Sequence, residues 1–160
     1  MRISGRFLCL GFFCAASILL FGVLYVTGGA GVDFDLDAFQ WKNRIILVFA
    51  PYADSDAYER QMRAFEGQED GILDRDLIIL ELFEKGESRL GDRSLSERVA
   101  PQMRRQFDVG KGEFVFILIG KDGTVKRRSP VPVSVSDIFS MVDAMPMRQQ
   151  EMRRKHNGIR

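Results

Sequence analysis

The sequence predicts an α/β fold in which a mixed sheet of four strands carries helices on both faces. Three apolar runs, at residues 45–50, 77–83 and 114–119, are typical of strands buried on both faces. Segments whose apolar residues recur three and four positions apart lie between these runs and predict amphipathic helices. Because helices separate the strands, we expect parallel crossovers, and a final hairpin adds one antiparallel strand.

The first strand and the helix behind it have clear boundaries in the sequence. Pro51 ends the first apolar run, and residues 54–56 are Asp, Ser and Asp, which are preferred at helix N-caps. Tyr58, Met62 and Phe65 then recur four and three positions apart. This spacing predicts a helix with one apolar face.

A second helix is predicted after the second strand and the polar loop 86–93. Ser94 and Glu97 fit a capping box, and apolar residues follow at every fourth position up to Phe107. Pro101 lies inside this pattern, so we expect the helix to kink or restart there.

The last part of the domain predicts a hairpin and a final helix. Asp-Gly at 122–123 is a hairpin turn signal, and the charged residues 125–128 suit the returning edge strand. Either Ser134 or Ser136 is expected to cap the final helix. Pro146 interrupts this helix, and we expect the charged tail beyond it to fray.

An apolar segment precedes the predicted domain. Arg2 and Arg6 stand before an uncharged run over residues 7–26, which as a helix can cross a hydrocarbon core of about 30 Å. Residues 1–30 are therefore either a transmembrane anchor or a signal peptide cut near the small residues 27–30, and both alternatives stay open. The basic flank predicts export. We expect a periplasmic protein, released or held in the inner membrane, with the membrane as a partner through residues 7–26 if they are retained.

Length and charge limit the remaining possibilities. The chain has 160 residues and a formal net charge of +1, which fits one domain, placed at residues 31–147. The tail 148–160 has a net charge of +4, and the domain itself is mildly acidic. A nearly neutral domain lacks the basic surface of a nucleic-acid binder, so we expect no nucleic-acid partner.

The position of the cysteines excludes thiol chemistry in the exported domain. Cys9 and Cys14 are the two cysteines of the chain, and both lie in the apolar run. The domain therefore has no thiol for disulfide exchange or peroxide reduction, and no disulfide.

Several short stretches resemble one family, the thioredoxin-like domain of unknown function 4174, also called the DUDES domain. They are Trp41-Lys42-Asn43-Arg44 before ILVFAP, the stretch 73–76, the stretch 118–123 and the stretch 143–149. The resemblance covers roughly residues 34–152 and is that of an exported bacterial member. It implies a thioredoxin-like fold, preceded here by the apolar N-terminal helix, and the family implies no settled activity.

The resemblance directs attention to the residues after the first strand. In thioredoxins and peroxiredoxins the reactive cysteine lies there, at a helix N-terminus, but residues 51–56 contain no sulfur. The strand that starts at Phe114 also has no proline immediately before it. Asp54 and Asp56 are weak candidates for a metal site, and capping of the helix is the preferred interpretation. We assign no catalytic residue and expect no cofactor.

Arg44, Lys121 and Arg148 are charged residues within the motifs that resemble the family. They are candidates for a shared binding surface, and the alternative is a structural role in turns and ion pairs. If the three side chains converge with a buried carboxylate in one cleft, a ligand site or enzyme is favoured. If they scatter over the surface, that interpretation loses its support.

The sequence favours a non-catalytic binding or interaction module in the cell envelope, with an envelope protein as its partner. The first alternative is a non-thiol enzyme or a small-anion-binding domain that uses Arg, Lys and carboxylate groups. The second alternative is a membrane-associated structural protein.

Overall fold

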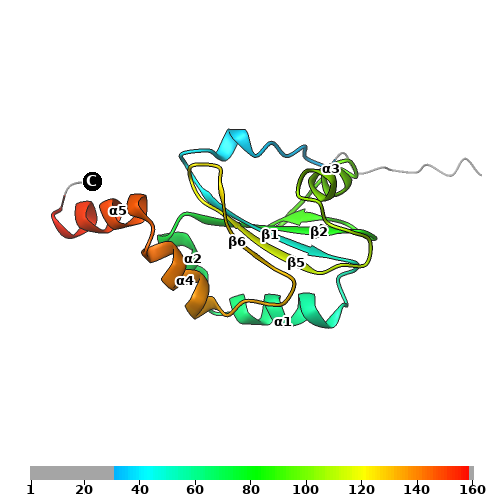
Figure 1. Cartoon of the computed structure of the whole chain (residues 1–160). Coiled ribbons are helices and arrows are strands. Elements are labelled where there is room, and N and C mark those ends of the chain that lie inside the picture. The colour runs from blue at the N-terminus through cyan, green and yellow to red at the C-terminus, as the bar shows by residue number, and fades with distance from the viewer. Residues whose placement is uncertain (1–30, 159–160) are drawn as a thin grey trace, which may run out of the picture.

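The computed structural model describes residues 31–158, which form one sheet between two layers of helices (Figure 1). Within these residues the sheet has six strands in the order β4-β3-β2-β1-β5-β6. The strands are β1 (Arg44–Ala50), β2 (Leu77–Phe83), β3 (Arg89–Leu90), β4 (Arg93–Ser94), β5 (Val115–Ile119) and β6 (Val125–Ser129). The helical elements are the 3-10 turn η1 (Asp37–Phe39), α1 (Asp56–Phe65), α2 (Glu69–Asp74), α3 (Val99–Gln106), α4 (Val135–Asp143) and α5 (Pro146–His156). The predicted α/β class, with a mixed sheet and helices on both faces, is confirmed.

Strand β1 lies at the centre of the sheet, and all seven of its residues are buried. It runs parallel to β2, beginning with Arg44 beside Leu77, and antiparallel to β5, where Phe49 lies beside Val115. The expectation that helices between strands imply parallel crossovers is therefore wrong for β5. This strand begins at the end of the sheet where β2 finishes, and apolar periodicity does not encode the direction of a strand.

Alternate residues of β1 face two separate apolar clusters, because successive side chains of a strand point to opposite faces. Ile45, Leu47 and Phe49 pack in the cluster that includes α3 and the lead-in before β1. Ile46 and Val48 pack in the cluster that includes α1 and α4. Figure 1 shows α1 and α4 on one side of the sheet and α3 on the other. Both faces of the sheet are thus covered, which explains the continuous apolar runs in the sequence.

The predicted loop 86–93 contains most of the hairpin β3–β4, which adds two strands to the four that the sequence predicted. Each of these strands is two residues long, too short to show an alternating pattern. Ser94 pairs in β4, so the predicted capping box with Glu97 is wrong. Helix α3 begins at Val99 instead, and Pro101 lies in its first turn, where proline is tolerated.

Two predicted helix caps have different outcomes. The hydroxyl of Ser134 accepts a hydrogen bond from the amide of Asp137 at 3.1 Å, so the first of the two serines proposed for α4 is the cap. Ser55 is the N-cap residue of α1, but its hydroxyl donates to the carbonyl of Tyr52 at 2.9 Å. The start of α1 therefore has the expected residue types without a side-chain bond to a helix amide.

The chain beyond Pro146 is helical, which corrects the expectation that it frays. Helix α5 has proline in its first turn, where the fixed backbone angle of this residue favours a helix. Figure 1 shows α5 extending away from the sheet. The predicted signal or anchor, residues 1–30, lies outside the described residues. Among residues 31–158 no helix is long and apolar enough to cross a membrane.

Candidate functional site

The guanidinium of Arg44, at the start of β1, is fully buried and binds a carboxylate of the last helix. Its Nη1 and Nη2 atoms each donate to one carboxylate oxygen of Glu151 at 3.2 Å. Nη1 also donates to the carbonyl of Arg75 at 2.9 Å, whereas Nε is buried and has no partner. Two parallel bonds between a guanidinium and a carboxylate form the most favourable geometry for such a pair.

Lys121 follows β5 and brings a second cation to the same carboxylate. Its Nζ lies 2.9 Å from Oε1 of Glu151 and 2.7 Å from Oδ2 of Asp76, and 9% of its side chain is exposed. Burial acts to raise the pKa of Glu151, but the hydrogen bonds and charges of Lys121 and Arg44 outweigh burial and lower it. Glu151 is therefore ionised at neutral pH.

Arg148, in the first turn of α5, joins this helix to α2 and α4. Its guanidinium pairs with the carboxylate of Asp74, donates to the carbonyl of Asp74 at 2.6 Å and donates from Nε to Oδ1 of Asp143 at 3.1 Å. Burial acts to lower the pKa of Arg148, but the two carboxylates outweigh burial and raise it. Arg148 thus holds three segments of the chain together at one point.

Two further ion pairs surround these contacts. Nη2 of Arg75 lies 2.6 Å from Oδ2 of Asp143, and its guanidinium stands 4.0 Å from the ring centroid of Phe139. Lys155 pairs with Asp74 and lowers the pKa of that carboxyl. Together these groups form what we call the charged cluster. Its cations are Arg44, Arg75, Lys121, Arg148 and Lys155, and its carboxylates are Asp74, Asp76, Asp143 and Glu151.

The charged cluster brings together the three residues that the sequence singled out. Arg44, Lys121 and Arg148 each have a nitrogen within 4.0 Å of the Glu151 carboxylate. A cavity of about 40 Å³ adjoins Arg44 and Lys121. The sequence did not identify Glu151, because it lies in the tail that was expected to fray. The other three carboxylates stand inside the motifs that resemble the family, which is the signal that pointed to this region.

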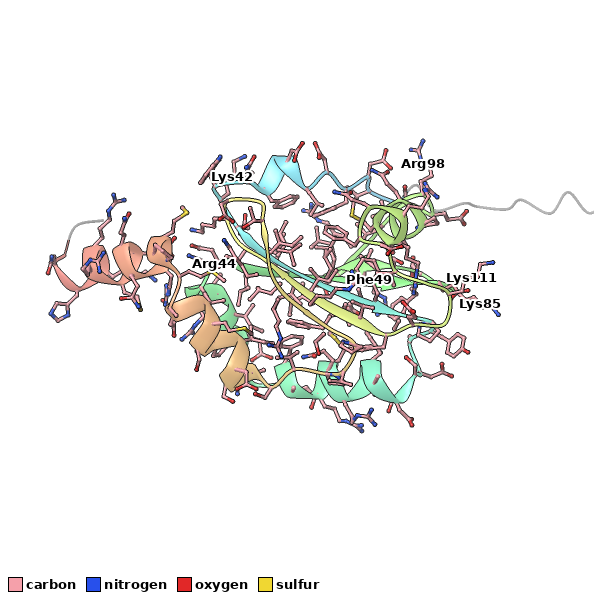
Figure 2. All side chains as sticks on the ribbon, viewed as in Figure 1. Lys42, Arg44, Phe49, Lys85, Arg98 and Lys111 are labelled. Atoms are coloured by element: carbon pink, nitrogen blue, oxygen red, sulfur yellow. The ribbon has the colours of Figure 1, made fainter. Side chains whose placement is uncertain are left out.

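The opposite end of β1 is where thioredoxin-like enzymes carry their reactive cysteine. Residues 51–56 follow the strand without a sulfur atom, and the side chains of Asp54 and Asp56 are exposed. Between residues 31 and 158 there is no group of three or more His, Cys, Asp or Glu side chains that could hold a metal ion. Figure 2 shows Lys85 and Lys111 at this end of the sheet, far from Arg44.

A buried arginine of α3 also belongs to this opposite end. Arg104 donates from Nη2 to the carbonyl of Ala50 at 2.7 Å and from Nη1 to the carbonyl of Gly110 at 2.8 Å. Burial lowers its pKa, and the charges of Glu84 and Glu113 oppose this shift. Both terminal nitrogens are thus engaged by the backbone. The sequence did not identify Arg104, because a single basic residue on an amphipathic helix carries no pattern.

Solved structures with a similar fold include peroxiredoxins. The reduced 2-Cys peroxiredoxin of Plasmodium vivax aligns with a TM-score of 0.58 at 16% identity, over 73% of this chain and 85% of that protein. The mitochondrial 2-Cys peroxiredoxin of Plasmodium falciparum aligns with a TM-score of 0.54 at 12% identity, over 78% and 84% of the two chains. At these identities the likeness establishes a thioredoxin-like fold.

Relatives with similar sequences are much longer proteins. Coiled-coil domain-containing protein 80 of Danio rerio is 29% identical over 133 residues, which are 73% of this chain and 15% of that protein. Sushi repeat-containing protein SRPX2 of Homo sapiens is 27% identical over 139 residues, which are 84% of this chain and 29% of that protein. The chain thus spans less than a third of the length of either relative. Residues 35–151 match the family described as "Domain of unknown function (DUF4174)". The matched region includes every member of the charged cluster except Lys155. The chain belongs to this family.

Proposed function

We propose that the chain is a non-catalytic, thioredoxin-like binding module that is exported to the cell envelope and contacts a protein there. The observation that carries this proposal is the end of β1, where residues 51–56 supply no sulfur to a fold otherwise built like a peroxiredoxin. Arg104, the buried cation at that end, already donates to two backbone carbonyls, so each of its terminal nitrogens has a partner within the domain.

The size of the relatives also supports a modular role. In both, the matching region is a minor part of a longer protein, as is usual for a domain that contributes one contact surface to a larger assembly. In this chain the apolar run 7–26 would determine where the module works, either as an anchor or as a signal that is removed.

Site-specific photo-cross-linking of the full chain in its native membrane tests this function. A photoreactive phenylalanine analogue replaces, one at a time, exposed apolar residues from different sides: Trp41, Tyr52, Leu73 and Val131. We expect one or two of these positions to capture the same envelope protein, while the remaining positions capture none. Equal capture at every position, or none at any, contradicts a specific binding surface.

A peroxide assay tests the absence of thiol catalysis. The full chain and its Cys9→Ser, Cys14→Ser variant are compared for peroxide consumption with dithiothreitol as the reductant. We expect both proteins to match the buffer rate, because the exported domain has no thiol. Turnover that survives removal of both cysteines would establish a non-thiol enzyme and end the proposal.

A second candidate function is the binding of a small anion, or catalysis by Arg, Lys and carboxylate groups. The convergence of Arg44, Lys121 and Arg148 on one carboxylate favours it, because such clusters also occur at ligand sites. Against it, each of these cations already has a carboxylate of the chain as its partner. Calorimetric titration of the wild-type chain with phosphate and with acetate separates the two functions. The binding module predicts no heat of binding up to millimolar anion.

A further inference from the structure

Helix α5 is attached to the domain by charged groups rather than by apolar packing. Its one buried side chain is Arg148, and none of its residues belongs to the two apolar clusters of the described region. Its attachments are the ion pairs of Arg148, Glu151 and Lys155, together with a hydrogen bond from Gln149 to the carbonyl of Asp143. Because detachment exposes little apolar surface and returns the charged groups of the helix to water, α5 detaches at a lower cost than an element of the apolar core.

The groups that receive Glu151 are held in place without α5. Arg44 belongs to the central strand and is bonded to the carbonyl of Arg75. Lys121 follows the neighbouring strand and pairs with Asp76. The sheet therefore supplies a preformed pair of cations, and α5 supplies only the carboxylate that they bind.

Detachment of α5 leaves one buried cation without a carboxylate. Arg75 keeps Asp143 and Lys121 keeps Asp76, but the guanidinium of Arg44 retains a single carbonyl. Its Nε has no partner even with α5 in place, and a cavity lies beside it. Without α5 the guanidinium of Arg44 has no carboxylate partner, so a new carboxylate is favoured over an empty site.

When α5 detaches, Asp74 also loses its two cationic partners, Arg148 and Lys155. A segment that replaces α5 must therefore supply basic groups as well as a carboxylate. On α5 the groups that satisfy this end of the domain are Arg148, Glu151 and Lys155, spaced three and four positions apart. Residues with this spacing share one face of a helix. A helix that carries a carboxylate, a basic residue three positions before it and another four positions after it therefore complements both Arg44 and Asp74.

We propose that Arg44, Lys121 and Asp74 form a docking site for a helix of a partner protein with this charge pattern, and that α5 occupies the site in the isolated chain. The inference rests on the proposed binding function and names the chemistry of the partner. Release of α5 and capture of the partner helix are thus one exchange reaction. A partner segment that lacks the central carboxylate is not expected to compete with α5.

Fluorescence anisotropy of a labelled synthetic peptide of residues 145–157 tests the site, with the full chain in detergent as the titrant. Glu151→Gln weakens the chain's own helix, so we expect this variant to bind the peptide at least about tenfold more tightly than the wild type. Lys155→Gln opens the site without leaving a buried charge, and we expect a gain of about threefold. Glu59→Gln, at an exposed pair with Arg63, is the control and should match the wild type.

Two further arms establish which groups bind the peptide. A peptide with glutamine at the position of Glu151 should bind the Glu151→Gln and Lys155→Gln chains with no higher affinity than it binds the wild-type chain. Adding Lys121→Gln to Glu151→Gln should remove the gain, and circular dichroism checks that this variant is folded. Lys121 is chosen because Arg44 is fully buried, so that its loss would disturb the fold.

Three results of the peptide titration overturn the inference. They are an equal affinity of opened and wild-type chains for the peptide, equal binding of the glutamine peptide, and a gain that persists without Lys121. A concentration-dependent dimer of the Glu151→Gln chain in size-exclusion chromatography would assign the site to a second copy and also overturn it. Specific cross-links elsewhere on the domain would then leave the binding function intact, so the two failures are distinguishable.

Discussion

The two ends of β1 satisfy their buried cations in different ways. At its start, Arg44 faces the carboxylate of Glu151, which arrives on a terminal helix. At its end, Arg104 faces the carbonyls of Ala50 and Gly110, which belong to the main chain beside the sheet. A side-chain carboxylate on α5 can be exchanged for another, whereas a backbone carbonyl cannot. The start of β1, at Arg44, is therefore suited to a replaceable contact. The end of β1, beside Arg104, has a permanent contact, and we call it the permanent end.

This difference also separates the chain from the enzymes that share its fold. Their reactive cysteine would stand at the permanent end, where residues 51–56 are Pro, Tyr, Ala, Asp, Ser and Asp. The charges that the chain does gather lie at the other end, in the charged cluster. The charged cluster thus lies at the opposite end of β1 from residues 51–56, where enzymes with this fold carry their reactive cysteine. Such a difference is expected where one fold serves different functions.

Replacing Arg104 with methionine is expected to have the largest effect on stability. The free energy of unfolding should fall by about 3 kcal/mol, because two carbonyls lose a charged donor inside the domain. Urea denaturation followed by far-UV circular dichroism measures it. Arg105→Met, at the exposed neighbouring position, should cost less than about 0.5 kcal/mol. Similar losses in both variants would contradict the permanent contact.

Replacing Asp143 with asparagine weakens the other end by a smaller amount. We expect a loss of about 1–2 kcal/mol, because Asp143 is partly buried and pairs with both Arg75 and Arg148. The same denaturation experiment applies, with Glu87→Gln in an exposed loop as the control. If the two variants unfold alike, the ion pairs at this end contribute nothing to stability.

Acid should separate the two ends without any substitution. The pKa values of Asp74, Asp143 and Glu151 are all lowered, so their stabilising effect is complete at neutral pH. It is lost as the pH falls through these lowered values, below about pH 4. The carbonyl partners of Arg104 do not titrate in this range. Amide chemical shifts should therefore change in residues 146–156 before they change in residues 99–106, which carry Arg104, and the reverse order would contradict the comparison.

The smallest expected effect on stability comes from restoring a sulfur atom at the permanent end. In a chain without Cys9 and Cys14, Ser55→Cys should change the free energy of unfolding by less than about 0.5 kcal/mol, since Ser55 bonds no helix amide. Its thiol should react with iodoacetamide with an apparent pKa below about 8.5, because it lies at a helix N-terminus. Ser140→Cys, inside α4, is the control. Equal apparent pKa values would show that the start of α1 does not favour a thiolate.

The fold was predictable where burial determines the sequence, and less so elsewhere. The strands β1, β2 and β5 have apolar runs because both of their faces are covered. The hairpin β3–β4 was missed because it is too short for a pattern. Helix α5 was missed because charges attach it, and charges have no periodicity that identifies a partner.

The candidate site was predictable only in part for the same reason. The short motifs pointed to Arg44, Lys121 and Arg148, and the structure brings them together. Their mutual carboxylate, Glu151, lies 107 residues from Arg44 along the chain. Nothing in the local sequence links such distant residues, so an ion pair between them follows only from the topology of the sheet and the position of α5.

Trp41 gives the charged cluster an intrinsic optical reporter. It is the one tryptophan of the chain, its side chain is 62% exposed, and its amide donates to the carbonyl of Lys121 at 2.7 Å. The indole already contacts solvent in the folded protein, so its emission should shift little on unfolding. The same exposure makes its quenching by iodide or acrylamide sensitive to what covers the neighbourhood of Lys121. Tryptophan emission from this protein is therefore a poor measure of core unfolding, whereas its quenching reports on the solvent access of the surface around Trp41.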